Sequence, residues 1–509
     1  MDTTSLAGLI RLQGTQRGSH PYLHFEGQSL TYADLDRTSS ALASVLAAEG
    51  VGPGDRVAIL EKNTPLCFDV MFGAAKCGAV SVPINWRLAP TEVTAIVVDA
   101  GAKVLIVGEE FDSPVIDGVH VVRAPDVATW CATSDGVDPG YEQRSDEVAI
   151  QLYTSGTTGL PKGVILTNCN LLGRLGDAGK LWGYDPDSVN LVVSPLFHVG
   201  GAGTALLAFI PGATSVMLRT ADPVQILSAV GTYSVTNALL VPALIQMLLD
   251  SPGCEDVDWS TFRTLMYGAS PISESLLRRA MSVMRCDFIQ LYGITEHSGC
   301  LTYLSPGDHD PEQRPALLRS CGKPLPWVDL KIVDPDDLTP LGPYQVGEIW
   351  VRSDQTMLGY WKQPDATAAA LTPEGWLRTG DAGFRDDEGY LILHDRIKDM
   401  IVSGAENIYP AEVENVLSSH PAVADCAVIG APHDRWGETP LAVIVLRAGT
   451  SATPDLDVDI IAFCRQRLAG FKCPTRVKVV DVLPRNPAGK VLKRELREVA
   501  WAGHARRVG

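Results

Sequence analysis

The chain lacks the patterns of a disulfide-stapled, zinc-binding or membrane-spanning protein. Its 11 cysteines are scattered singly, with no C-x-x-C pair and no histidine at zinc-ligand spacing, which favours reduced core residues. The most apolar long stretch, residues 191–218, is interrupted by His198, two prolines and four glycines, as in buried strands and loops rather than a transmembrane segment. The first ten residues hold no basic region followed by an apolar run, so we expect no secretory signal and a cytoplasmic location.

Positive charge is also scarce. Lys and Arg total 42 against 60 Asp and Glu, a formal net charge of −18, which argues against nonspecific binding to nucleic acid or to an anionic membrane. We therefore expect no nucleic-acid partner. A length of 509 residues exceeds the roughly 250–300 residues that one core supports, so at least two domains are expected, and a homo-oligomer is possible.

The first part of the chain alternates helical patterns with short β-branched runs, which indicates an α/β fold with packed sheets. Two of the expected strands end in glycine-containing turns, where a ligand could meet the carboxyl edge of a sheet. The expected strands are Arg56–Leu60, Ala79–Ile84, Val104–Val107, Leu191–Val193, Ser215–Leu218, Thr264–Tyr267 and Phe288–Leu291.

Beyond about Asp395 the pattern changes to a compact helix-strand-strand-helix-strand order. We predict a large N-terminal domain over residues 1–397 and a small, mobile α+β C-terminal domain over residues 398–509. The small domain's expected elements are Ala411–Ser418, Asp425–Ile429, Leu441–Leu446, Val458–Leu468 and Val477–Val482.

One run of eleven residues, Tyr153–Gly163, holds four Ser or Thr hydroxyls, three glycines and one lysine. Glycines let backbone N–H groups approach oxyanions, hydroxyls add donors and the lysine adds a charge, so the run predicts a phosphate cradle. The spacing is not that of a Walker A loop, because Gly163 follows the lysine. The candidate phosphate-binding residues are Thr154, Ser155, Gly156, Thr157, Thr158, Gly159 and Lys162.

This ordered string resembles the signature loop of the adenylate-forming superfamily: acyl-CoA synthetases, nonribosomal peptide synthetase adenylation domains and firefly-type luciferases. Further family segments follow in the same order over nearly the whole chain. They are Pro195–Gly201, Gly268–Pro271, Gln290–Glu296, Trp376–Asp381, Asp395–Ile401 and Arg485–Val491.

The resemblance implies roles for the segments that bind ATP. Tyr292 offers a flat face to the purine, Thr295 donates to the α-phosphate, and Glu296 is the ligand of the accompanying Mg²⁺. The residues Gly268, Ala269, Ser270 and Gly293 complete the segments that hold adenine and phosphate.

Four more residues take roles from the same resemblance. Asp381 accepts hydrogen bonds from the ribose hydroxyls, and Arg396 binds ribose or phosphate. Lys398 stands at the hinge between the domains. Lys490 bridges the substrate carboxylate and the α-phosphate during adenylation. With Thr295, Glu296 and the pocket residue His198, Lys490 forms the candidate catalytic set.

The acyl pocket is expected beside His198, where Gly200, Gly201 and Gly203 would leave space for a bulky acyl or aryl chain. The implied reaction has two halves: ATP converts a carboxylic acid to acyl-AMP, and a thiol then displaces AMP. The resemblance brings the segment containing Gly404 toward the pantetheine of coenzyme A after rotation about Lys398. Relatives commonly carry a second glycine where this chain has Ala405, which bears on the thioester step.

The resemblance is strongest to bacterial fatty acyl-CoA ligases, so we expect a ligase that activates a fatty or other hydrophobic acid with ATP, Mg²⁺ and coenzyme A. The alternative is a free-standing adenylation enzyme that loads an aryl or amino acid onto a carrier protein. Phe197–Gly200 holds no aspartate of the kind that amino-acid activators use for the α-amine. A luciferase-like oxygenase and a non-enzymatic nucleotide-binding protein are more distant alternatives, and retention of Glu296, Asp381, Arg396 and Lys490 speaks against the last.

Overall fold

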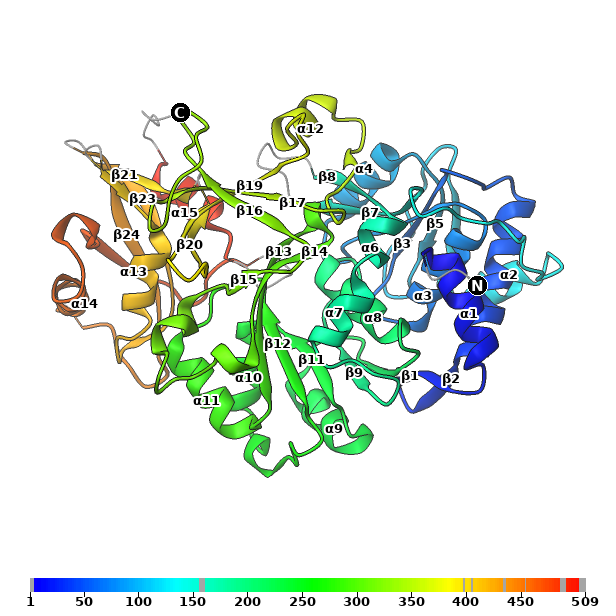
Figure 1. Cartoon of the computed structure of the whole chain (residues 1–509), viewed down its shortest axis with the longest axis horizontal. Helices are drawn as coiled ribbons and strands as arrows, with labels where there is room; N and C mark the ends of the chain where they lie inside the picture. Colours follow the sequence, from blue (N-terminus) through cyan, green and yellow to red (C-terminus); the bar gives the residue numbers. More distant parts are fainter. Residues whose placement is uncertain are drawn as a thin grey trace.

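The structure is a computed structural model, and it describes residues 4–154, 161–396, 399–403, 406–433, 436–453, 455–485 and 491–502. The strands form two large sheets, a smaller antiparallel sheet and a C-terminal sheet (Figure 1). The predicted fold class, a large α/β N-terminal part and a small C-terminal α+β part, is confirmed. Within the described residues, no helix combines the length and apolar composition needed to cross a bilayer.

A seven-stranded sheet holds the predicted phosphate-binding run at one side. The strands from β7 through β6 pair in parallel, whereas β8 pairs antiparallel with both β7 and β18. In spatial order the strands are β18 (Gly359–Tyr360), β8 (Lys162–Thr167), β7 (Val148–Thr154), β4 (Val80–Pro83), β3 (Arg56–Leu60), β5 (Ala102–Val107) and β6 (His120–Arg123).

A nine-stranded sheet carries the predicted nucleotide segments at Gly268 and Tyr292. Its strands from β13 to β1 are parallel, so their carboxyl ends meet at one edge. In spatial order they are β15 (Lys323–Pro324), β14 (Gly299–Leu304), β13 (Asp287–Ile294), β12 (Thr264–Gly268), β11 (Asn237–Leu240), β9 (Val189–Val192), β10 (Thr214–Met217), β1 (Pro21–Phe25) and β2 (Gln28–Thr31).

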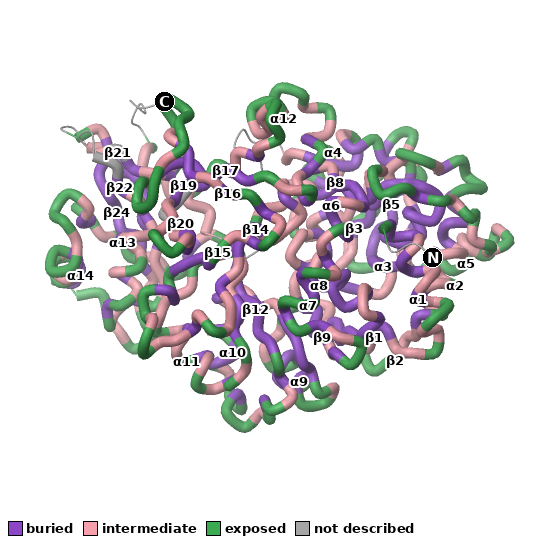
Figure 2. Tube along the Cα trace, viewed as in Figure 1, coloured by how far each residue is buried: buried purple, intermediate pink, exposed green. Residues whose placement is uncertain are grey.

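Helices pack against these two sheets, and Figure 2 shows many of the strands as buried while much of α12 (Pro364–Ala370) is exposed. Proline occupies the first turn of several helices, where its missing N–H costs no hydrogen bond. The helices of this part are α1 (Leu6–Gln16), α2 (Tyr32–Ala48), α3 (Pro65–Lys76), α4 (Pro90–Ala100), α5 (Val127–Cys131), α6 (Asn168–Leu172), α7 (Leu175–Leu181), α8 (Val199–Phe209), α9 (Pro223–Tyr233), α10 (Pro242–Asp250), α11 (Glu274–Met284) and α12 (Pro364–Ala370).

An antiparallel sheet of four strands and a C-terminal sheet of five complete the fold. The four-stranded sheet has the order β16 (Asp329–Val333), β17 (Gly347–Arg352), β19 (Leu377–Arg385) and β20 (Leu391–Arg396). The C-terminal part contains β21 (Ile401–Ser403), β22 (Glu406–Ile408), α13 (Pro410–Leu417), β23 (Val423–His433), β24 (Gly437–Leu446), α14 (Leu456–Arg465), β25 (Arg476–Val479) and α15 (Lys493–Ala500).

The predicted strands and helices all correspond to observed elements, with ends displaced by a few residues. The sequence analysis missed the β7–β8 hairpin, the four-stranded sheet, the β21–β22 hairpin and α15. Two hydrophobic clusters of the C-terminal part draw only on residues from Ile401 onward. All eleven cysteines are free and buried or partly buried.

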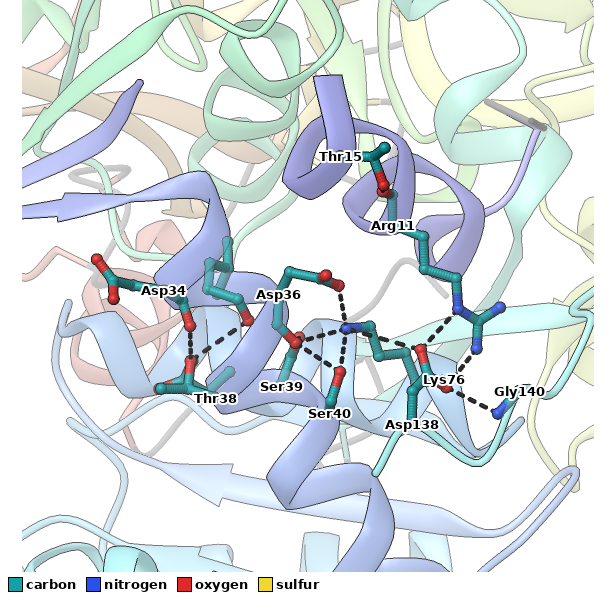
Figure 3. Close-up of polar contacts among 12 residues, drawn as sticks. Arg11, Thr15, Asp34, Asp36, Thr38, Ser39, Ser40, Lys76, Asp138 and Gly140 are labelled. Carbon is teal, nitrogen blue, oxygen red and sulfur yellow. Dashed lines mark hydrogen bonds and ion pairs between the residues drawn. The ribbon is translucent and has the colours of Figure 1, made fainter. Parts of the chain in front are cut away.

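Buried charges join the N-terminal helices. The Lys76 side chain is fully buried, and its ammonium donates to the Asp36 carbonyl oxygen at 2.7 Å, to Asp36 Oδ1 at 2.5 Å and to Ser40 Oγ at 2.8 Å (Figure 3). Burial lowers the pKa of Lys76, and the Asp36 carboxylate opposes that change. Arg11 makes two 2.7 Å bonds to Asp138, whose carboxylate lies 3.9 Å from Lys76. The network therefore ties α1, α2 and α3 to the loop at Asp138.

Replacing Lys76 by alanine is expected to lower the free energy of unfolding by about 3 kcal/mol, because it leaves a cavity and removes the cation shared by several oxygens. Equilibrium unfolding in urea measures the loss. Lys180→Ala is the control, since that side chain is 82% exposed and 3.8 Å from Asp177, and we expect a change below about 0.5 kcal/mol. Equal losses in the two variants would contradict a stabilising role for the network.

Candidate active site

The carboxyl ends of β12 and β13 bring together two of the predicted nucleotide segments. Gly268 pairs with Leu291 in the parallel ladder, so Ala269 and Ser270 lie beside the Tyr292 segment. A Cβ on Gly268 would stand 2.1 Å from the Leu291 carbonyl oxygen, which is too close for any side chain. Ala269 adopts a left-handed φ of 63°, and the chain turns sharply away from the strand there. At this edge the backbones of β12 and β13 are therefore in direct contact, with no side chain between Gly268 and Leu291.

A tight turn after β13 presents Thr295 and Glu296. Gly293 faces the returning strand β14 so closely that a Cβ would lie 1.8 Å from the Gly299 carbonyl oxygen. Thr295–His297 forms a single 3₁₀ turn, and Ser298 follows with a φ of 54°. Thr295 and Glu296 are therefore held at the tip of the β13–β14 turn, at the edge where ligands bind in open α/β sheets.

Tyr292 joins this edge to the four-stranded sheet. Its ring is 8% exposed, and its hydroxyl donates to Asp381 Oδ2 at 2.7 Å. Burial, the Asp381 charge and this bond raise the pKa of Tyr292 well above its usual value, so the phenol is the donor. Asp381 pairs with Arg396 along the β19–β20 ladder. Two residues predicted to contact the nucleoside are thus bonded to each other.

The buried carboxylate of Glu348 accepts hydrogen bonds from the segment that ends at Asp381. Glu348 Oε2 accepts from the Trp350 indole N–H at 2.8 Å and from Arg378 Nε at 3.1 Å. Glu348 Oε1 accepts from the Gly380 backbone N–H at 3.2 Å. A depression of about 350 Å³ runs between this group and the phosphate hairpin, lined in part by Lys162, Tyr360 and Thr379. The sequence analysis missed Glu348, which carries no motif of its own.

The described ends of the phosphate hairpin face each other. Thr154 closes β7 and pairs with Lys162 at the start of β8. Gly163, in β8, leaves no room for a side chain, because a Cβ there would stand 2.7 Å from Gln151 Nε2 and 3.2 Å from the Tyr153 ring. The Lys162 ammonium lies 4.7 Å from the centroid of the Tyr360 ring. Lys162 and Glu296 both contact Tyr360, whose hydroxyl donates to Glu296 Oε1 at 2.9 Å.

His198 lies at the same edge, in the loop between β9 and α8. Its ring packs 4.5 Å from Phe197, and Phe197 meets Trp86 edge-on at 6.4 Å. The Nε2 atom is buried and has no hydrogen-bond partner among the described residues. Burial, with the nearby Arg87 charge, lowers the pKa of His198 to about 4, so the imidazole is neutral at pH 7. An unbonded polar atom in an aromatic surrounding suits a pocket that receives a ligand.

Asn63 positions the His198 loop, and the sequence analysis missed it. The side chain is 3% exposed and follows β3, in the other large sheet. Its amide donates to the Ser194 and Leu218 carbonyl oxygens at 3.1 and 3.3 Å, and its oxygen accepts from the Leu196 N–H at 3.1 Å. The available signal was a polar residue three positions after the end of a buried strand.

The three glycines near His198 differ in what surrounds them. A Cβ on Gly201 would stand 2.2 Å from the Pro195 carbonyl oxygen, so Gly201 permits a close backbone contact and leaves no space. A Cβ on Gly200 would reach Leu239 at 3.4 Å, whereas a Cβ on Gly203 would meet nothing within 4 Å. Of the three glycines, only Gly203 borders open space. The expectation that all three make room for an acyl chain therefore applies to Gly203 alone.

Several predicted site residues lie outside the described residues, and their roles stay predictions. For Arg396 the structure places the main chain in β20 and gives no side-chain contact. The residues outside the described ranges are Ser155, Gly156, Thr157, Thr158, Gly159, Lys398, Gly404, Ala405 and Lys490.

The chain matches two family models in succession. Residues 10–361 match the AMP-binding enzyme family, and residues 412–490 match the AMP-binding enzyme C-terminal domain. A fatty acid–acyl-carrier-protein ligase of Streptomyces coeruleorubidus is 40% identical over 500 residues, covering 96% of this chain and 95% of that relative. A long-chain-fatty-acid–CoA ligase of Mycobacterium tuberculosis is 35% identical over 486 residues, covering 92% and 93%.

A solved structure agrees with these relatives. The o-succinylbenzoate CoA synthetase of Bacillus subtilis, in complex with its acyl-adenylate intermediate, superimposes with a TM-score of 0.85 at 31% identity, covering 96% of this chain and 97% of that one. The chain therefore belongs to the AMP-binding enzyme family, whose members use ATP. Within it, the chain is an AMP-forming acid–thiol ligase akin to the fatty acyl-CoA ligases.

The pKa of His198 leads to a prediction about pH. Above pH 6.5 the imidazole is neutral in both the folded and unfolded chain. As the pH falls toward 4, the unfolded chain binds a proton that the folded protein does not, so stability falls. Between pH 7.5 and pH 5 this group should account for a loss of about 2 kcal/mol.

His198→Gln removes that titration while keeping a polar side chain. Urea unfolding at both pH values should show a smaller loss of stability in the variant than in the parent protein. Other histidines contribute equally to both proteins and cancel in the difference. Identical losses in the two proteins would show that His198 is not buried in its neutral form.

Proposed function

We propose that this enzyme activates a fatty or other hydrophobic carboxylic acid with ATP and Mg²⁺, and transfers the acyl group to coenzyme A, with release of AMP and pyrophosphate. The observation that carries the proposal is that three sheets contribute residues around the turn holding Thr295 and Glu296: Lys162 and Glu296 both contact Tyr360, and Tyr292 bonds to Asp381. We further propose a cytoplasmic location and a domain boundary between residues 397 and 398.

The chemistry explains why two steps are needed. A carboxylate resists attack by a thiol, because its charge repels the nucleophile and oxide is a poor leaving group. In the first step a carboxylate oxygen attacks the α-phosphorus of ATP, and the bond to pyrophosphate breaks. In the second step the thiol sulfur attacks the acyl carbon, the bond to AMP breaks, and a thioester forms. The protein contributes positioning and electrostatic stabilisation to both.

The described donor set fits a magnesium ion bound together with ATP. No group of three or more His, Cys, Asp or Glu side chains within the described ranges could hold a metal by itself. Mg²⁺ usually takes one or two carboxylates and completes its shell with phosphate oxygens and water, so the single carboxylate of Glu296 suffices. Bound there, the ion would neutralise charge on the phosphate oxygens.

We propose the remaining roles from the family resemblance. Thr295 donates to the α-phosphate from the turn that also presents Glu296, and Lys162 with the Thr154 loop holds the outer phosphates. Asp381 receives the ribose hydroxyls, with Tyr292 beside the purine and Arg396 on the neighbouring strand. Lys490 bridges the carboxylate and the α-phosphate, and rotation about Lys398 then replaces it with the Gly404 segment for thioester formation.

The neighbourhood of His198 supports an acid with an apolar body. Phe197 and Trp86 are aromatic and the imidazole is neutral, so these three side chains offer an apolar surface, with the Arg87 guanidinium over the Trp86 ring as the nearby charge. On α8, a Cβ added to Gly203 would meet no other atom within 4 Å. We therefore place the acyl chain between His198 and α8.

A carrier protein is the second candidate acceptor. It is favoured by the 40% identical relative, whose name states an acyl-carrier-protein acceptor. Coenzyme A and a carrier protein present the same phosphopantetheine thiol, so the adenylation site is compatible with either.

ATP–pyrophosphate exchange across fatty, aryl and amino acids tests the first step, and product formation with coenzyme A or a phosphopantetheinylated carrier protein tests the second. We expect exchange with hydrophobic acids and a coenzyme-A thioester. If the acyl product formed on the carrier protein and not on coenzyme A, the carrier protein would be the acceptor and the coenzyme-A proposal would be wrong. No exchange with any acid of the panel would count against the proposed function.

Lys490→Ala should strongly slow adenylation, because it removes the cation proposed to bridge the substrate carboxylate and the α-phosphate as charge builds up between them. We expect exchange to fall by about a hundredfold to a thousandfold, the range found for removing one preorganised donor. Thioester formation from chemically prepared acyl-AMP should be affected much less. If the variant kept its exchange activity and lost only the thioester step, the proposed division of labour would be wrong.

A further inference from the structure

A short segment of the chain, Met357–Lys362, connects the two charged groups of the candidate site; we call it the strap. Its strand β18 pairs antiparallel with β8, with Gly359 opposite Ile165 and Tyr360 opposite Val164. The backbone N–H groups of Leu358 and Trp361 donate to the Ile165 and Gly163 carbonyl oxygens at 3.0 and 2.7 Å. The strap is therefore part of the sheet that holds Lys162.

The same strap binds the opposite sheet through Glu296. The Met357 N–H donates to the Glu296 carbonyl oxygen at 2.9 Å, and the Tyr360 hydroxyl donates to Glu296 Oε1 at 2.9 Å. Both the main chain and the carboxylate of Glu296 are thus bonded to one strap. A hydrogen bond to a charged acceptor is roughly twice as strong as one between neutral groups.

The Tyr360 ring also receives the Lys162 ammonium on its face, at 4.7 Å from the centroid. One side chain therefore contacts a cation from the seven-stranded sheet and an anion from the nine-stranded sheet. Among the described residues, the Lys162 ammonium contacts the Tyr360 ring and the Glu296 carboxylate accepts from the Tyr360 hydroxyl, and no ion pair joins the two charges. Both charges contact the same tyrosine rather than each other, which leaves them available to phosphate and to metal.

Further contacts hold the strap in place behind Tyr360. The Trp361 indole N–H and the Lys362 ammonium donate to the Asp99 carbonyl oxygen at 2.9 and 2.7 Å. The Arg56 guanidinium stacks on the Trp361 ring at 3.5 Å. Because these contacts come from α4 and β3, the position of Tyr360 is set by the sheet and does not depend on a ligand.

We propose that Tyr360 is a positioning residue that sets the Glu296 carboxylate at a defined distance from Lys162, so that Mg²⁺ and the ATP phosphates bind between them. The proposal rests on the proposed function of this site. The phenol acts through Glu296 on the metal and through its ring on Lys162, and it takes no part in bond making. Removing the hydroxyl should therefore weaken metal-dependent binding of ATP and spare binding without metal.

Tyr360→Phe separates the two contacts, since it deletes the hydroxyl and keeps the ring. Calorimetric titration with ATP, in Mg²⁺ and in excess chelator, measures the metal-dependent part of the affinity. Mn²⁺ in place of Mg²⁺ allows a second readout by electron paramagnetic resonance. We expect metal-dependent affinity to fall about tenfold, as for a lost hydrogen bond to a charged group, and metal-free affinity to change less than about twofold.

Tyr344→Phe is the matched control, because that tyrosine is 59% exposed and packs on Phe384, away from both charged groups. It should leave both affinities unchanged. Thermal unfolding of each variant checks the fold. Tyr360→Leu, which also removes the ring, should weaken metal-free binding of ATP as well.

A double-mutant cycle with Glu296→Gln decides whether the effect passes through that carboxylate. In the Glu296→Gln background, Tyr360→Phe should cause no further loss of metal dependence. Equal metal-dependent affinity in the parent protein and Tyr360→Phe, or fully additive losses in the cycle, would overturn the inference while the proposed function stands. A parent protein that binds no Mg·ATP would overturn both.

Discussion

Two backbone contacts that leave no room for a side chain govern the geometry of the site. At Gly268 and Gly293 a Cβ would stand 2.1 and 1.8 Å from the carbonyl oxygens of Leu291 and Gly299. These contacts fix the separation of β12, β13 and β14, and so fix where the β13–β14 turn ends. The bonds of Tyr292 and Glu296 to the four-stranded sheet and to the strap form only when that turn is in place.

Much of the fold could be predicted because its determinants are local. The parallel strands are short apolar runs bounded by glycine and proline turns, so the expected segments such as Arg56–Leu60 and Thr264–Tyr267 match the observed strands closely. The ordered segments of the family could also be identified in the sequence, and in the structure Tyr292 bonds to Asp381 while Glu296 and Lys162 both contact Tyr360. Their individual roles toward ATP remain proposals.

The missed features depend on partners far away in the chain. β18 is two residues long, and its pairing with β8 has no periodicity that a sequence could reveal. Asn63 and Tyr360 were missed because their partners come from another sheet: Asn63 bonds to the Ser194–Leu196 loop, and Tyr360 bonds to Glu296. The glycines near His198 look alike in sequence, yet Gly201 meets backbone and Gly203 meets open space. Such distinctions arise from packing and cannot be derived from composition or spacing.

The two halves of the candidate site are attached to different strands. The proposed nucleotide residues lie on β8, β12, β13 and β19, whereas the His198 loop follows β9 and is held by Asn63 from β3. Substitutions around α8 can therefore alter the shape of the acid-binding region without displacing the groups that handle ATP. Selectivity for the acid becomes a separately adjustable property, so enzymes on this scaffold can diverge in substrate while the energy-coupling apparatus is retained.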